Sequence, residues 1–148
     1  MPGTNLHRIK WRLKQEPFLS QPRYAVKHIL RLRAGTQRLR VVTGRHQGMH
    51  RSLRVCRVCG VAEVEDVEHY LEHCAKLADV RMDFWNSLFV LMHDHMYQRL
   101  RRMSELERVD WLLGTEPIFN SYKWPLLQKT ILKGLADIWR LRRKILIN

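Results

Sequence analysis

Apolar residues recur every three or four positions over much of the second half of this chain, the spacing of one face of an α-helix. Residues 77–93 carry such a stripe at Val80, Phe84, Leu88 and Leu91. In residues 103–113, Ser104 and Glu107 match the S-x-x-E capping box that begins many helices. Residues 124–147 carry the longest stripe, formed by Leu127, Ile131, Leu135 and Ile138. We therefore predict three helices after residue 76.

The first half of the chain is less regular. Residues 22–33 place Ala25, Ile29 and Leu32 at helical spacing, and Gly35 is a stop signal just after them. Residues 5–14 predict a short basic amphipathic helix. Residues 36–54 hold a short apolar run followed by two glycines. The pattern does not separate strand from helix, and we expect an irregular connector there.

These patterns predict a mainly α-helical protein with no strand alternation. A length of 148 residues and a hydrophobic share of 45% are enough for one domain with a core. We divide the chain into a basic N-terminal arm and connector (1–54), a zinc-binding segment (55–76) and C-terminal helices (77–148) that pack with that segment.

The zinc-binding segment contains all three cysteines of the protein. Cys56, Cys59, His69 and Cys74 follow the pattern C-x2-C-x9-H-x4-C, two close pairs of metal ligands that resemble a zinc knuckle. Thiolates and a neutral imidazole in tetrahedral array suit Zn²⁺. Gly60 can take the positive φ that closes the turn after Cys59. Residues 65–72 are expected to form a helix that carries His69.

Four protein ligands leave no open position on the metal, so we predict a structural zinc ion. A redox C-x-x-C pair would need a thioredoxin-like βαβ context, which the pattern lacks. Three unrelated buried cysteines are a further alternative. His73 is the rival of His69 as the fourth ligand, although its position next to Cys74 makes a shared tetrahedral site awkward.

The charge of the protein is strongly uneven. Of the formal net charge of +13, residues 1–54 contribute +12, from 13 Lys+Arg and the single acid Glu16. This asymmetry favours a polyanionic partner, most simply RNA or DNA, because arginine and lysine contacts with phosphate supply much of non-specific affinity. The candidate contacts are seven arginines: Arg31, Arg33, Arg38, Arg40, Arg45, Arg51 and Arg54. A solvated charged face is the alternative.

The remaining features limit the class of protein. An odd number of cysteines argues against a disulfide framework and for a reducing compartment. The first 15 residues have no apolar run typical of a secretory signal, and no stretch is long and apolar enough for a membrane span. We expect an intracellular protein, nuclear or cytoplasmic, that is not secreted and has no membrane partner.

The order of motifs around the cysteines resembles a known family. The chain reads LRAGTQRL from Leu32, then Gly44-Arg45, then RVCRVCG from Arg54, then EDVEHYLEHC from Glu65. This resembles the C-terminal zinc-binding tail that follows the polymerase in non-LTR (LINE-type) retrotransposon reverse transcriptases. The resemblance covers about residues 30–74, and it implies that Cys56, Cys59, His69 and Cys74 bind zinc. Ala75 departs from the proline that is common there in the family.

No catalytic motif accompanies this tail-like segment. The sequence lacks a polymerase palm motif, an endonuclease, a nucleophile elbow and a phosphate-binding loop, and we predict that the chain is not an enzyme. The favoured function is a nucleic-acid-binding module held by structural zinc. One alternative is a zinc-stapled module that binds a protein partner or a second copy through its C-terminal helices. Another is a retroelement remnant with no independent function.

Overall fold

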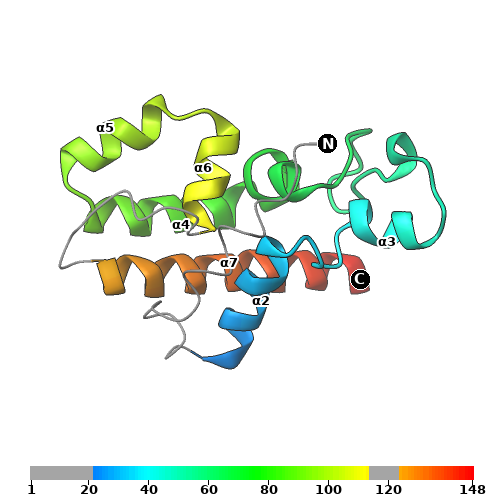
Figure 1. Cartoon of the computed structure of the whole chain (residues 1–148), viewed down its shortest axis with the longest axis horizontal. Coiled ribbons are helices and arrows are strands. Elements are labelled where there is room, and N and C mark those ends of the chain that lie inside the picture. The colour runs from blue at the N-terminus through cyan, green and yellow to red at the C-terminus, as the bar shows by residue number, and fades with distance from the viewer. Residues whose placement is uncertain (1–21, 114–123) are drawn as a thin grey trace.

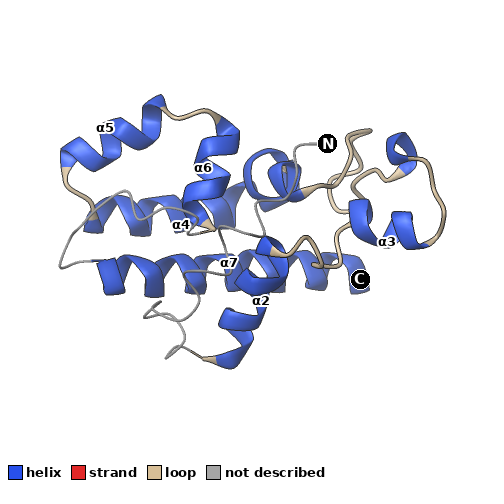
Figure 2. Cartoon of the chain, in the orientation of Figure 1, coloured by secondary structure: helices blue, strands red, loops and turns tan. Residues whose placement is uncertain are grey.

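The structure is a computed structural model, and it describes residues 22–113 and 124–148. The described part is mainly helical, as predicted, and contains no β-strand; Val55 and Val64 form an isolated antiparallel bridge (Figure 2). The helix predicted over residues 5–14 lies outside the described residues. No helix in the described ranges combines the length and the apolar character that crossing a membrane requires.

The longest helix, α7 (Trp124–Ile147), forms the centre of the fold. It packs against α4 (Ala78–Leu91) and also against α2 (Arg23–Arg33), so these three helices enclose the core (Figure 1). The stripes predicted for α2 and α7 are buried, as are Phe84 and Leu88 of α4. Helices α4 and α7 meet most closely at Gly134, where an added Cβ would lie 2.0 Å from the Phe84 ring. This spacing requires glycine.

Two shorter helices lie along the other side of α4. Helix α6 (Glu105–Leu112) begins at the predicted capping box, in which Ser104 and Glu107 satisfy each other's backbone N–H groups. Helix α5 (Asp94–Arg102) was not predicted. It buries only Met96 and Leu100, and the rest of its sequence is polar, so its apolar stripe is too short to identify from the pattern.

The segment predicted as a basic arm and connector is part of the same fold. Helix α2 confirms the expectation for residues 22–33, and its apolar face is buried. The expectation of an irregular connector over residues 36–54 was wrong in part, because Arg40–His46 forms α3 and Arg51–Leu53 forms a 3₁₀ turn, η2. Gly44 of α3 packs directly against the side chain of Arg54, where a Cβ would lie 2.7 Å from its Cγ.

A buried carboxylate connects residues 55–76, the segment with the candidate metal ligands, to α7. Glu65 is 2% exposed and accepts hydrogen bonds from Arg142 Nε at 2.7 Å and Nη2 at 2.9 Å. It also accepts the backbone N–H of Arg40 at 2.7 Å, which fixes the start of α3. Arg142 Nη2 donates in addition to the carbonyl of Arg38 at 3.2 Å. The Glu65–Arg142 ion pair therefore connects three parts of the chain: residues 55–76, the basic segment before them (residues 22–54) and α7.

Arg142→Met should lower the free energy of unfolding by about 3–5 kcal/mol, because it leaves the Glu65 carboxylate buried without its cation. Chemical denaturation of the two proteins measures this difference. The matched control is Arg143→Met, which removes an exposed arginine one position along and should change stability by less than about 0.5 kcal/mol. Equal effects of the two substitutions would contradict a stabilising role for the pair.

A second buried polar group lies between α2 and α7. His28 contacts the Trp139 ring with 5.2 Å between centroids, and its Nε2 lies 3.4 Å from the Tyr70 hydroxyl. Burial lowers the pKa of His28 from 6.5 to about 4. The folded chain therefore keeps this imidazole neutral, whereas the unfolded chain protonates it below about pH 6.5. Its contribution to the free energy of unfolding declines as the pH falls from 6.5 towards 4.

Lowering the pH from 7 to 5 should reduce the free energy of unfolding of the wild type by about 2 kcal/mol more than it reduces that of His28→Gln. Denaturation at both pH values measures the difference. His46→Gln is the control, because His46 is exposed and the variant should keep the full acid sensitivity. Both variants retain the four candidate metal ligands, so acid protonation of those ligands affects them equally. Identical pH profiles for the two variants would contradict the assignment to His28.

Candidate metal centre

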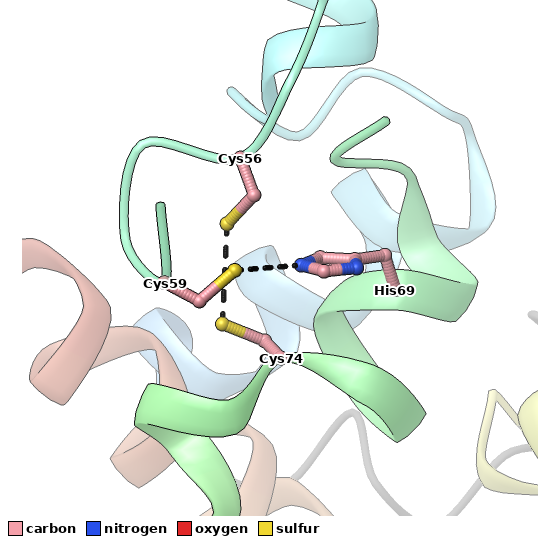
Figure 3. A group of neighbouring side chains, drawn as sticks. All are labelled: Cys56, Cys59, His69 and Cys74. Carbon is pink, nitrogen blue, oxygen red and sulfur yellow. Dashed lines mark hydrogen bonds between the residues drawn. The ribbon is translucent and has the colours of Figure 1, made fainter. Parts of the chain in front are cut away.

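The first pair of candidate ligands lies on a tight loop that begins at the Val55–Val64 bridge. The backbone N–H of Cys56 donates to the Glu63 carbonyl at 2.9 Å, which closes the base of the loop. Gly60 has a φ of 71°, as predicted for the turn after Cys59. The loop therefore directs both thiols to one side, where they face the second pair (Figure 3).

The second pair lies on a helical segment of unusual pitch. The expected helix over residues 65–72 was wrong at its start, because helical structure begins only at Val67 and Glu65 is buried against Arg142 instead. The Asp66 carboxylate accepts the His69 N–H at 2.9 Å and caps the segment. From His69 to His73 the chain is a π-helix, η3, which ends with a Cys74 N–H to His69 carbonyl bond of 2.8 Å.

The π-turn explains how two ligands five residues apart can share one ion. In an α-helix, His69 and Cys74 would point about 140° apart, because each residue advances about 100°. The wider i→i+5 turn brings them to the same side. Cys74 then begins a short 3₁₀ turn, η4 (Ala75–Leu77), that leads into α4. The local geometry that forms the site thus also sets the direction of the next helix.

The four candidate ligand atoms all lie within 4.8 Å of one another, and the group can hold a metal ion. The sulfurs of Cys56 and Cys74 are 3.9 Å apart, and Cys59 Sγ lies 3.5 Å from His69 Nε2 (Figure 3). A tetrahedral ion with ordinary metal–sulfur and metal–nitrogen distances would separate such atoms by about 3.8 and 3.6 Å. Both measured separations therefore fit one tetrahedral ion.

A carboxylate orients the imidazole of the site. Glu63 Oε2 lies 2.9 Å from His69 Nδ1, and a proton on Nδ1 would leave Nε2 with a free lone pair towards the cysteines. Metal-binding histidines usually have such a partner on their second nitrogen, which fixes the tautomer and raises the basicity of the ligand. The sequence pattern did not identify Glu63. The only feature of the sequence that could have indicated Glu63 as the partner of His69 is its position six residues earlier.

The thiols of Cys56 and Cys74 are hydrogen-bonded to each other. The hydrogen bond between the two buried thiols raises the pKa of Cys56 and lowers the pKa of Cys74, so one proton is held between two sulfurs. A divalent ion would replace that proton and hold both groups as thiolates.

His73 does not belong to this cluster. Its Nε2 pairs with Glu105 Oε2 at 2.9 Å, and both side chains are partly exposed to solvent. Glu68, His73 and Glu105 form a separate group of potential ligands, of the exposed acidic kind that commonly holds no ion. The alternative left open by the sequence, His69 or His73, is therefore resolved in the structure by position: His69 lies with the cysteines.

The seven predicted nucleic-acid contacts are divided by the structure into two groups. Arg31, Arg38, Arg45 and Arg51 are exposed, and Arg51 pairs with Asp66 at 2.9 Å. Arg33 is buried at 6% exposure and donates to the Leu113 carbonyl, so its selection as a surface contact was wrong. It lies on the core side of α2, which the charge pattern alone did not reveal.

Two more of these arginines have structural partners. Arg54 donates to the Met49 carbonyl from Nε and Nη2, at 3.0 and 2.7 Å, and to the Val41 carbonyl at 3.1 Å. Arg40 is half-buried and lies against Gln47 and Met49. The guanidinium of Arg54 is half-buried and thus satisfies backbone groups around α3.

Comparison with known proteins adds no relative: no family model, no curated protein and no solved structure matches this chain.

His69→Gln should abolish metal binding, whereas His73→Gln should keep one ion per chain, because the nitrogen of His69 lies with the three sulfurs and that of His73 pairs with Glu105 instead. Elemental analysis of the purified variants after gel filtration measures metal per chain. The two substitutions are matched in chemistry and lie four residues apart on one helical segment. Metal retained in His69→Gln and lost in His73→Gln would contradict the assignment of the fourth ligand.

Proposed function

We propose that this chain is a nucleic-acid-binding module whose fold is held by one structural zinc ion. Three thiolates and one imidazole are soft and borderline donors that suit Zn²⁺, and four such groups would fill all four positions of a tetrahedral ion. A complete tetrahedron leaves no position for a metal-bound water, which supports a structural rather than a catalytic role.

The observation that carries the nucleic-acid proposal is the charge of the segment before the zinc site. Residues 22–54 contain nine Lys+Arg and no acid. Arg31, Arg38 and Arg45 are exposed and form no ion pair with any residue in the described ranges. Unpaired arginines repel one another unless a polyanion is present, and their planar guanidinium groups suit bidentate contacts with phosphate.

The zinc segment is placed to organise these arginines. Glu65, nine residues after Cys56, fixes the N–H of Arg40 at the start of α3. Arg142 binds that carboxylate and the Arg38 carbonyl together. The ion would hold the loop on which Glu65 lies, so the backbone that carries Arg38 and Arg45 would be fixed in advance of binding. The order of motifs, which resembles the tail of non-LTR retrotransposon reverse transcriptases, supports the same proposal.

The alternative of a protein-docking module has less support. The apolar stripe of α7 that would offer a docking face is buried against α2 and α4, with Leu127 and Leu135 at 0% exposure. Tyr24, the exposed tyrosine of α2, lies beneath the Arg140 guanidinium at 5.0 Å. The exposed surface around α2 and α3 is thus basic rather than broadly apolar.

The triple variant Arg31→Gln/Arg38→Gln/Arg45→Gln should bind RNA or DNA more weakly than the wild type at low salt. The slope of log affinity against log salt should fall by about 2–3, because up to three phosphate contacts are lost. Fluorescence anisotropy over a salt series measures both quantities.

The matched control is Lys76→Gln/Arg102→Gln/Lys129→Gln, which removes the same net charge from exposed positions elsewhere. Its salt slope should stay close to that of the wild type. Affinity in the wild type that does not change with salt would contradict the proposed function, as would an equal loss of slope in both triple variants.

A further inference from the structure

A groove of about 390 Å³ lies between α4, α5 and α6, on a part of the chain that the basic segment does not include. Its volume is within the range of about 300–1,000 Å³ that is typical of small-molecule sites. Trp85 and Phe89 of α4 form one wall, and their rings stack with 5.7 Å between centroids and 24° between planes. Both rings are half-buried, so part of each still faces solvent.

Polar groups converge on the same groove. Glu72 and Arg108 pair across it, with 3.3 Å between Nε and Oε1, and the Glu72 side chain is 11% exposed. Asn86, on the exposed side of α4, adds an amide with both a donor and an acceptor. Arg101 reaches the edge from α5 and lies 5.7 Å from the Tyr97 ring centre. An aromatic wall is thus combined with a carboxylate, an amide and two guanidinium groups.

These groups select the kind of occupant. An apolar side chain of a partner protein would cover Asn86 and Arg101 and leave their polar atoms without replacement hydrogen bonds, which is costly. A nucleobase has a flat face for the aromatic wall and an edge of donors and acceptors for the polar groups. Arg101 is then in place for the phosphate that every nucleotide carries.

We propose that this groove binds one unpaired base of a single-stranded nucleic acid, a claim that rests on the proposed function and adds a second contact to it. Trp85 and Phe89 provide the stacking surface, Glu72 and Asn86 meet the hydrogen-bonding edge, and Arg101 contacts the phosphate. The basic segment binds the backbone of either a single strand or a duplex. The groove accepts only a base that is free of pairing, so it gives a preference for single strands.

The test compares a short single strand with a duplex of the same length at fixed salt. Asn86→Ala and Arg101→Gln should each weaken single-strand binding about fivefold or more and leave duplex binding nearly unchanged. Arg102→Gln is the charge-matched control, because Arg102 is exposed on the same helix and does not line the groove. A single strand that contains photoreactive 5-iodouridine should crosslink to Trp85 or Phe89.

The possible outcomes separate this claim from the proposed function. Crosslinks confined to residues 22–54, together with variants that behave like Arg102→Gln, would overturn the groove and leave the proposed function intact. If no nucleic acid binds, a titration with nucleoside monophosphates decides the groove separately, through amide shifts of α4 and α5 measured by NMR. Absence of such shifts would overturn it. The groove proposal would also be overturned if an apolar peptide displaced a bound single strand and Asn86→Ala had no effect on single-strand binding.

Discussion

The structure depends on one geometric constraint: four side chains from a loop and a π-turn must reach a single point. Residues 55–74 contribute only a few apolar side chains, such as Val58, Tyr70 and Leu71, to the core. A tetrahedral ion bound by four side chains of this segment would hold its loop and its π-turn together. In small metal domains, metal binding and folding commonly occur together. The separations of the sulfur and nitrogen atoms fit such an ion.

The constraint extends beyond the ligands through Glu65. This carboxylate lies 3.9 Å from the sulfur of Cys56 and binds Arg142 of α7 through two hydrogen bonds. A centre of three thiolates and a divalent cation carries one negative charge, and Glu65 adds a second, so a buried arginine close by offsets part of this charge. The same arginine binds the Arg38 carbonyl. The proposed zinc ion, the last turns of α7 and the basic segment therefore form one connected unit.

Much of this arrangement could be predicted from the sequence, for reasons that differ by element. Helices α4 and α7 have long apolar stripes, and α6 begins with a capping box. These patterns predict helices because they depend on residues within a few positions of one another in the sequence. The spacing of Cys56, Cys59, His69 and Cys74 predicts that the four side chains lie around one point, and the structure brings these four together. Helix α5 was missed because two buried side chains are too few to define a period.

The roles of individual charged residues could not be read in the same way. Arg33, Arg54 and Glu65 look like ordinary surface charges in the sequence, and each is placed by a contact with a distant or irregular part of the chain. Glu65 and Arg142 are 77 positions apart, and Arg33 and Leu113 are 80 apart. Such partners depend on how helices pack, which periodicity does not encode. The π-turn at His69 brings two of the four candidate ligands to one side, and helix propensity does not predict such a turn.

The most direct test of the central claim is native mass spectrometry of the purified chain, with helical content followed by circular dichroism, before and after a strong chelator and in Cys74→Ser. We expect one zinc ion per wild-type chain, absent from the variant and after chelation, with a loss of helical signal in both cases. A wild-type chain that carries no metal and keeps its full helical signal would contradict the claim that a zinc centre holds this fold together.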